Sequence, residues 1–254
     1  MAPYDMLGNV VVVKFPRKTT LSEKKRFATR FLNEHVHVTS VLEKTGRIKG
    51  RLRTPTSKWL AGEKTKEVLY KENGCVFRFN VDTCYFSPRL AGERKELADM
   101  VKKGEHVLVL FGGVGPFAIV IAKEGKAERI VSVELSRVAS TYALDNVKRN
   151  KVAVEVVQGD VKRVLRKLGT FDRIIMARPN LQDMFLASAL RAVTKGTIIH
   201  YYGFCGEDEL LSMQHALVKE SADAGHAVKI IGTKRAGDIG TRRYRYRIDL
   251  KVIR

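Results

Sequence analysis

Short apolar segments alternate with amphipathic ones from residue 106 to residue 204, and this alternation constrains the fold more strongly than any other feature. The apolar segments have the length of strands and lie at 106–111, 129–135, 153–158, 171–177 and 197–204. The stretches between them have apolar residues at helical spacing and lie at 117–124, 136–150 and 182–194. Apolar strands separated by helices are typical of a parallel sheet covered on both faces. The sequence therefore predicts an α/β fold.

The C-terminal segment has a different pattern. The stretches "AVKIIGTKR" and "RRYRYRIDLKVI" are joined by "AGDIGT", which contains two glycines and no helical spacing. In the second stretch, charged residues alternate with Tyr244, Tyr246, Ile248, Leu250 and Val252. An antiparallel hairpin that ends a parallel sheet is typical of class I methyltransferases that use S-adenosylmethionine (AdoMet). We therefore predict a Rossmann-like, class I AdoMet-dependent methyltransferase domain over residues 86–254.

The first part of the chain, residues 1–85, predicts a small α+β domain. Residues 9–15 and 75–81 are rich in β-branched and aromatic side chains and predict strands. Residues 21–34 have apolar side chains on one helical face. The Gly- and Arg-rich stretch "GRIKGRLRTP" predicts a loop or an exposed hairpin. We expect this smaller domain to position an RNA.

A glycine-rich turn, "GGVG", follows the first strand of the larger domain and precedes a helix. Bare backbone at such a turn lets a ligand approach closely, and the free N–H groups of the helix face the same space. The spacing is neither the GxGxxG dinucleotide fingerprint nor a P-loop. Carboxylates follow the next two strands, where an acid can bind ribose hydroxyls or lie at an adenine edge. We predict a nucleoside cofactor site made of Phe111, Gly112, Gly113, Gly115, Phe117, Glu134, Asp160 and Pro179.

The charge of the chain predicts a polyanionic partner. Lys and Arg number 47 against 27 acidic residues, a net charge of +20 that is spread along the chain. Such a balance favours nucleic acid, and no apolar run indicates a membrane span. Three scattered cysteines argue against disulfides and a zinc site, and no metal site is expected. These features, with no signal-peptide pattern, predict a cytoplasmic protein.

Three long motifs, "YFSPRLAGERKELADMV", "FGGVGPFAIVIAK" and "IIHYYGF", resemble the tRNA (guanine-37-N1) methyltransferase family of archaea and eukaryotes. The resemblance covers nearly the whole chain. The related aminocarboxypropyl transferases of wybutosine synthesis have "FSPGN" and "GIGYF" where this chain has "FSPRL" and "GVGPF", which favours methyl transfer. Many family members carry an additional N-terminal domain, and we expect this chain to begin at the second domain.

The resemblance implies methyl transfer from AdoMet to N1 of guanosine 37, with the tRNA anticodon stem-loop as partner. It implies that Glu93 is the general base and that Arg53 steadies guanine O6. Arg89 is the third residue that we expect to be catalytic, and it lies four residues before Glu93, on the same face if residues 88–103 are helical. An ordinary helix ion pair is the alternative for these two residues, and a phosphate contact or a solvated charge is the alternative for Arg53. We expect the substrate to contact Arg94, Tyr85, Phe86, Asn180 and Tyr202.

Two departures from the family pattern leave other activities open. The family has Asn-Leu-Pro after the fourth strand, whereas this chain has "IMARPNLQDMF", with Ala177 in place of the asparagine. The family also tends to have Asp-Met-Phe-Ala-Gly where this chain has "LFGGVGPF". The alternatives are aminocarboxypropyl transfer, methylation of another tRNA or rRNA base, and RNA binding without catalysis. The sequence is compatible with a monomer and does not determine the oligomeric state.

Overall fold

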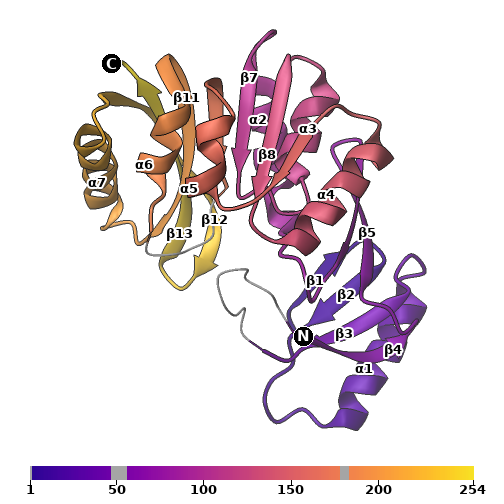
Figure 1. Cartoon of the computed structure of the whole chain (residues 1–254). Helices are drawn as coiled ribbons and strands as arrows, with labels where there is room; N and C mark the ends of the chain where they lie inside the picture. The colour runs from indigo at the N-terminus through magenta and orange to yellow at the C-terminus, as the bar shows by residue number, and fades with distance from the viewer. Residues whose placement is uncertain (1, 47–55, 178–182) are drawn as a thin grey trace.

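The computed structural model describes residues 2–46, 56–177 and 183–254 and has a seven-stranded sheet at its centre (Figure 1). The order of its strands is β12-β13-β11-β10-β7-β8-β9. Neighbouring strands from β11 to β9 are parallel, whereas β13 is antiparallel to β11 and to β12. The strands are β7 (His106–Leu110), β8 (Arg129–Glu134), β9 (Glu155–Gln158), β10 (Phe171–Met176), β11 (Val193–Cys205), β12 (Val228–Gly240) and β13 (Arg243–Val252). This arrangement confirms the predicted class I methyltransferase fold.

Helices cover both faces of this sheet. They are α2 (Ala91–Met100), α3 (Pro116–Glu124), α4 (Arg137–Asn150), α5 (Val161–Val164), α6 (Leu186–Ala189) and α7 (Leu210–Asp223). Val107 and Val109 of β7 pack in one apolar cluster with α2 and α3, and Leu108 and Leu110 pack in a second cluster with α5 and α6. Burial on both faces explains why the strand has a continuous apolar sequence. Among the described residues, no helix is long and apolar enough to cross a membrane.

Two predicted helices differ from the observed ones. Of the stretch 182–194, the described residues 183–194 contain only α6 and a 3₁₀ turn, Leu190–Ala192, before β11 begins. The stretch 88–103 begins with a 3₁₀ turn, Pro88–Leu90, and continues as α2 to Met100. Pro88 sets the backbone of that first turn without donating a hydrogen bond, which separates it from the α-helix that follows.

The smaller domain has a four-stranded sheet with one helix packed against it. The strands are β1 (Tyr4–Leu7), β2 (Val10–Val13), β3 (Ser40–Lys44) and β4 (Ser57–Gly62), in that spatial order. Helix α1 (Leu21–Glu34) begins at Thr20, whose hydroxyl accepts from the backbone N–H of Glu23 at 3.3 Å. The Glu23 carboxylate accepts from the Thr20 N–H at 2.7 Å, which completes a capping box. Ala28 and Phe31 of this helix are buried against the sheet.

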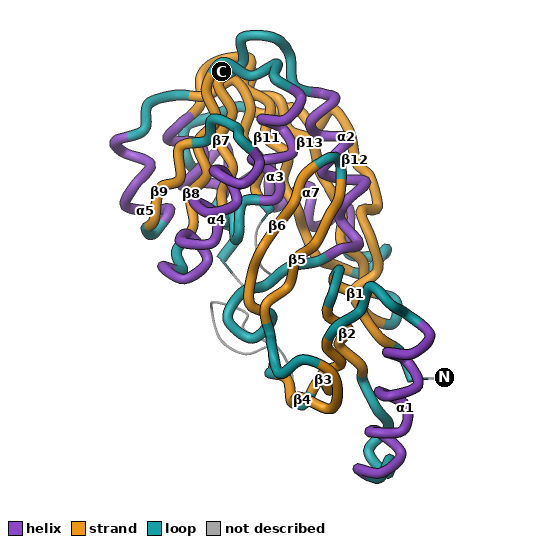
Figure 2. Tube along the Cα trace, turned by 90° about the vertical axis from the view of Figure 1, so that its right-hand side faces the viewer, coloured by secondary structure: helices purple, strands orange, loops and turns teal. Residues whose placement is uncertain are grey.

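A hairpin of β5 (Glu67–Glu72) and β6 (Cys75–Asn80) connects the small sheet to the larger domain (Figure 2). Asn150 of α4 accepts from the Val76 N–H at 2.7 Å and donates to its carbonyl at 2.8 Å. Asn146 makes the same two hydrogen bonds with the backbone N–H and carbonyl of Arg78. Two side-chain amides therefore pair with β6 as a neighbouring strand would. The division of domains after residue 85 stays a prediction, and the hairpin before that point packs against a helix of the larger domain.

Candidate functional site

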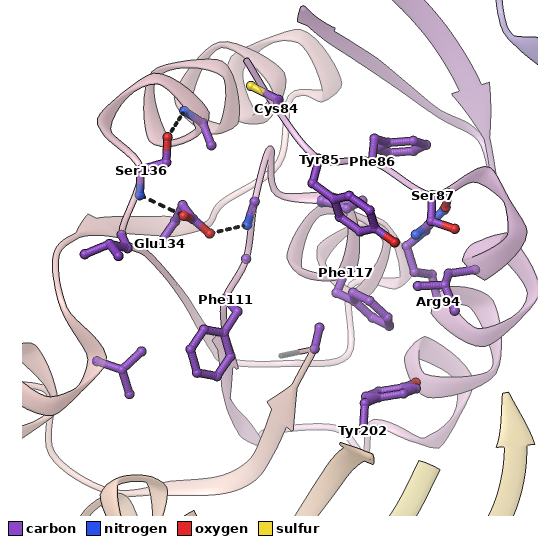
Figure 3. A pocket seen from close by; sticks show the side chains of 18 of the residues that line it. Cys84, Tyr85, Phe86, Ser87, Arg94, Phe111, Phe117, Glu134, Ser136 and Tyr202 are labelled. Atoms are coloured by element: carbon purple, nitrogen blue, oxygen red, sulfur yellow. Dashed lines mark hydrogen bonds between the residues drawn. The ribbon is translucent and has the colours of Figure 1, made fainter. Parts of the chain in front are cut away.

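A pocket lies at the carboxyl ends of the parallel strands, where open parallel sheets bind ligands (Figure 3). The glycine turn and Phe111 line one side, together with Glu134 and Asp160. The segment Thr83–Ser87, which leads into the 3₁₀ turn before α2, lines the other side with Phe117 and Tyr202. In Figure 3, Tyr85, Phe117 and Tyr202 face Phe111 and Glu134 across the cavity. The sequence analysis predicted these residues at the cofactor or substrate site, except that within Thr83–Ser87 it predicted only Tyr85 and Phe86.

Steric constraints on the backbone explain the glycines of the turn. A Cβ at Gly112 would lie 2.1 Å from the Ser132 hydroxyl of β8, so a side chain there would force that hydroxyl to move. Gly113 and Gly115 have φ angles of 57° and 87°, a region that glycine adopts without strain. Gly115 precedes the first residue of α3 and supports the pocket, although it does not line it. Phe111 also has a positive φ, 61°, and its ring packs edge-on against Phe185 at 5.1 Å.

Glu134 fixes the glycine turn to the start of α4. One carboxylate oxygen accepts from the Gly113 N–H at 2.9 Å, and the other accepts from the Ser136 N–H at 2.7 Å. Burial raises the pKa of this carboxyl, while the backbone hydrogen bonds oppose that shift. Each carboxylate oxygen has a second lone pair, so the group can accept two more hydrogen bonds, as from a pair of ribose hydroxyls. Asp160 accepts from the Lys162 N–H at 2.9 Å at the start of α5, and its predicted place at an adenine edge stays a prediction.

Arg94 forms part of the pocket wall, and a buried carboxylate neutralises the charge of its guanidinium. Its guanidinium makes a buried, two-pronged ion pair with Glu72 of β5, in which Nη2 lies 2.6 Å from the carboxylate. The same nitrogen donates to the Ser87 carbonyl at 3.1 Å. The guanidinium also lies over the rings of Phe86 and Phe117, at 5.1 and 5.7 Å. Arg94 therefore ties the hairpin to the pocket and holds two aromatic rings in place.

Glu93 points to the other side of this wall. Its side chain is only 6% exposed and does not line the pocket. One oxygen accepts from the Tyr202 hydroxyl at 2.8 Å and from Arg247 of β13 at 3.0 Å. Lys234 of β12 lies 2.8 Å from the other oxygen, as an ion pair outside hydrogen-bond geometry. The carboxylate is thus buried among cations, and Tyr202 is its contact to the pocket.

The predicted proximity of Arg89 and Glu93 is wrong. Arg89 lies in the 3₁₀ turn before α2, which directs its side chain to Asp5 of β1 at 2.6 Å. The Arg89 side chain is 71% exposed, whereas Glu93 faces the interior. The two residues therefore share neither a helix face nor an ion pair. The alternative that we weighed for them, an ordinary helix ion pair, is wrong for the same reason.

A second cavity, a groove of about 660 Å³, adjoins the pocket between the two domains. Both cavities are lined by Cys84–Ser87, Phe204 and Arg245. Asp5 and Lys44 line the groove from the small domain, and residues 236–240 line it from the end of β12. The groove therefore leads from the surface between the domains to the aromatic side of the pocket.

Comparison with known proteins assigns the chain and its fold to a family. Residues 68–231 match the TRM5/TYW2 methyltransferase domain, and residues 2–65 match the TYW2 N-terminal domain. The chain belongs to the TRM5/TYW2 family. It is 34% identical to the tRNA (guanine(37)-N(1))-methyltransferase Trm5b of Pyrococcus abyssi over 98% of this chain and 74% of that protein. The crystal structure of P. abyssi Trm5b superposes with a TM-score of 0.88 at 32% identity, covering 99% of this chain and 75% of that chain.

A relative with a different activity is almost as similar. The chain is 32% identical to the tRNA(Phe) (4-demethylwyosine(37)-C(7)) aminocarboxypropyltransferase of Methanocaldococcus jannaschii. That alignment covers 78% of this chain and 77% of the relative. Family membership therefore confirms the predicted superfamily and leaves the transferred group open.

Three predicted site residues, Arg53, Pro179 and Asn180, lie outside the described residues. Ala177, at the place of the family's asparagine, lines the pocket. In the described part of the chain, no group of three or more His, Cys, Asp or Glu side chains could hold a metal ion. This holds for His35 and His37, whose rings lie 6.2 Å apart and have no third ligand.

The sequence analysis missed Arg247 and Lys234, the two cations beside Glu93. The alternating pattern of β13 placed Arg247 on the face opposite Tyr246, and that pattern alone suggested an ordinary charged face. In the structure its side chain is 4% exposed, because α2 covers that face of the hairpin. The sequence does not show which strand of the hairpin is internal to the sheet, and in the structure β13 lies between β11 and β12.

Proposed function

We propose that this protein transfers the methyl group of AdoMet to N1 of guanosine 37 in tRNA. The observation that carries the proposal is the buried Glu93 carboxylate, joined to the nucleoside pocket through the Tyr202 hydroxyl. Guanine N1 holds a proton at neutral pH, so methylation needs a group that accepts it. The activity of the 34% identical P. abyssi relative supports the same target.

AdoMet is the cofactor of this family, and its sulfonium supplies an electrophilic methyl group when it is bound. The pocket fits such a nucleoside. The bare turn at Gly112 and Gly113 leaves room that a Cβ would fill, and Glu134 offers acceptors for ribose hydroxyls. Phe111 and Asp160 would complete the walls around the nucleoside.

The aromatic side of the pocket suits an extruded guanine. A base in an anticodon loop must leave its stack to be modified, and aromatic side chains replace the lost stacking. Tyr85, Phe117 and Tyr202 line this side, and Phe86 is fixed against Phe79 at 4.7 Å. These rings also exclude water, which strengthens the electrostatic interactions of Glu93 and its neighbours. The role of Arg53 at guanine O6 stays a sequence prediction.

The tRNA is proposed to bind along the groove between the domains. The net charge of +20 favours a nucleic acid with many phosphates. Lys44, Arg89 and Arg245 line the groove that leads to the pocket. An anticodon loop in the groove would present its extruded base beside the segment Cys84–Ser87.

Aminocarboxypropyl transfer is the second candidate function, and methylation of another RNA base is a third. The match of residues 2–65 to the TYW2 N-terminal domain favours the second candidate. The sequence "FSPRL", in which the aminocarboxypropyl transferases have "FSPGN", favours methyl transfer.

Two forms of labelled AdoMet separate these functions. Purified protein is incubated with a tRNA transcript that has guanosine at position 37 and, separately, with tRNA that has 4-demethylwyosine at position 37, the acceptor named for the aminocarboxypropyltransferase relative. The nucleosides are then identified by mass spectrometry. We expect label from methyl-labelled AdoMet in 1-methylguanosine and none from carboxyl-labelled AdoMet. A transcript with adenosine at position 37 is the control and should remain unlabelled. Transfer of the carboxyl label, or methyl label at another nucleotide, would contradict the proposal.

A further inference from the structure

Tyr202 separates Glu93 from the pocket. Its ring lines the cavity and packs beside Phe117, with ring centroids 5.9 Å apart. Its hydroxyl donates to the Glu93 carboxylate at 2.8 Å, and both groups are buried. A base in the pocket would therefore meet Tyr202 before it could meet Glu93. In Figure 3, the Tyr202 hydroxyl lies on the same side of the cavity as Arg94.

Behind Tyr202 lies a network of linked charges under α2, which we call the α2 charge cluster. Its carboxylates and cations are joined directly or through His200 by contacts of 2.7 to 3.1 Å, apart from one shorter pair between Lys234 and Glu96. The carboxylates are Glu93, Glu96, Glu105 and Asp249, and the cations are Arg173, Arg247 and Lys234. Carboxylates outnumber cations by one, so the cluster can take up one proton and become neutral.

His200 adds no charge to this cluster. Its Nε2 lies 2.7 Å from the Arg173 guanidinium, which can only donate, so Nε2 accepts. Its Nδ1 lies 2.7 Å from Asp249 and therefore holds the proton. Burial lowers the pKa of His200, against the effect of Asp249, which agrees with the neutral ring. The excess negative charge thus stays with the carboxylates.

We propose that Tyr202 relays the proton from the target base to Glu93, so that the tyrosine hydroxyl touches the reacting nitrogen. This inference rests on the proposed function. The N1–H bond of guanine breaks and its proton passes to the Tyr202 oxygen, while the phenolic proton passes to Glu93. The lone pair left on N1 forms the bond to the methyl carbon, and the electron pair of the broken carbon–sulfur bond stays on sulfur. The phenol is neutral before and after the step.

The environment of Tyr202 supports a concerted relay. Burial raises the pKa of Tyr202 well above its usual value, and the adjacent Glu93 carboxylate raises it further. Both effects disfavour a free tyrosinate, so we expect the two protons to move together. After the transfer the proton is held on Glu93, beside Lys234 and Glu96, whose side chains are 46% and 33% exposed to water.

Single-turnover methylation of a guanosine-37 transcript tests the relay with Tyr202→Phe and Glu93→Gln. Each change should slow methyl transfer by about 10²- to 10⁴-fold, the usual contribution of proton transfer. The double variant should be no slower than the worse single variant, because both act on one path. Binding of AdoMet and of tRNA, measured by calorimetry, should be unchanged. Tyr201→Phe is the matched control, since Tyr201 is buried on the opposite face of the same strand.

The pH profile distinguishes proton transfer from a structural role. Guanine N1 loses its proton in alkaline solution, so both variants should regain rate relative to wild type as the pH rises. A purely structural defect would leave the ratio constant. The groups that surround Tyr202 and Glu93 are those of the α2 charge cluster and His200, and none of them is changed in Tyr202→Phe.

A proton inventory on the wild-type protein needs no variant. If two protons move together, the methylation rate should fall along a curve as the D₂O fraction rises, and a straight line would overturn the relay. A Tyr202→Phe rate close to wild type would also overturn the relay and leave the proposed function intact. If wild-type protein forms no 1-methylguanosine, both proposals fail together.

Discussion

The two sides of the pocket are built in different ways. The cofactor side is made of backbone at the ends of neighbouring strands, with Glu134 bonded to Gly113 and Ser136. The side that we propose for the guanine depends on the α2 charge cluster, whose members come from α2, β10, β12, β13 and the residue before β7. Its central contacts join residues far apart in the chain, with Arg247 bonded to a carboxylate 154 positions away. A site made from local backbone tolerates changes elsewhere, whereas a buried charge cluster depends on every one of its members.

Among the variants considered, Arg247→Met should lower the stability of the folded protein most. This change leaves Glu93, Glu96 and Asp249 without their shared cation in the interior. Loss of one partner from a buried ion pair costs about 3–5 kcal/mol, so the free energy of unfolding in urea should fall by that amount. The control is Arg243→Met on the same strand, whose exposed pair with Glu209 contributes about 0–1 kcal/mol. Equal losses in the two variants would contradict the contrast between buried and exposed charges.

On the cofactor side, Gly112→Ala should have a smaller effect on stability. The new Cβ would lie 2.1 Å from the Ser132 hydroxyl, and such overpacking costs about 1–3 kcal/mol. AdoMet affinity, measured by calorimetry, should fall as the turn shifts. Adding Ser132→Ala to the Gly112→Ala variant should restore both the stability and the AdoMet affinity, because it removes the hydroxyl that clashes with the new Cβ. Gly92→Ala is the control, since a Cβ there meets no atom within 4 Å and a helical alanine is favourable.

The smallest expected effect is a loss of AdoMet affinity at low pH, caused by the protonation of Glu134. Because burial raises its pKa, AdoMet should begin to bind more weakly at a pH above 4.5, the usual value for this carboxyl. The loss should not exceed about tenfold per pH unit, the limit for one proton. A raised carboxyl pKa means that protonation of Glu134 favours the folded state, so unfolding caused by this group cannot explain the loss.

Glu134→Gln provides the control for that measurement. Its AdoMet affinity should be lower than that of the wild type and independent of pH over the same range, as followed by calorimetry. A wild-type affinity that is constant down to pH 4.5 would show that the ionised carboxylate is not needed for binding.

Much of the cofactor side could be predicted from the sequence. The glycine turn, Glu134 and Asp160 follow successive strands, and the carboxyl ends of parallel strands meet at one edge of the sheet. Their proximity therefore follows once the strands are recognised. The aromatic residues Tyr85, Phe86 and Tyr202 were expected at the site because an extruded base needs stacking partners, and the structure brings all three to the pocket.

The partners of the charged residues could not be predicted in this way. Arg94 pairs with Glu72 of the hairpin and Arg89 pairs with Asp5 of the small domain. Each choice depends on which element packs beside α2 and on the 3₁₀ turn that precedes this helix. Helical spacing alone favoured an ion pair between Arg89 and Glu93, because it assumed one continuous helix.

The sequence by itself determined the order of strands and helices, the glycine turn and the family, since these depend on local spacing and backbone sterics. Only the tertiary structure decided that Glu93 faces Tyr202 and Arg247 in the interior. The physical reason is that a buried carboxylate needs partners, and those partners come from whichever strands pack beneath its helix.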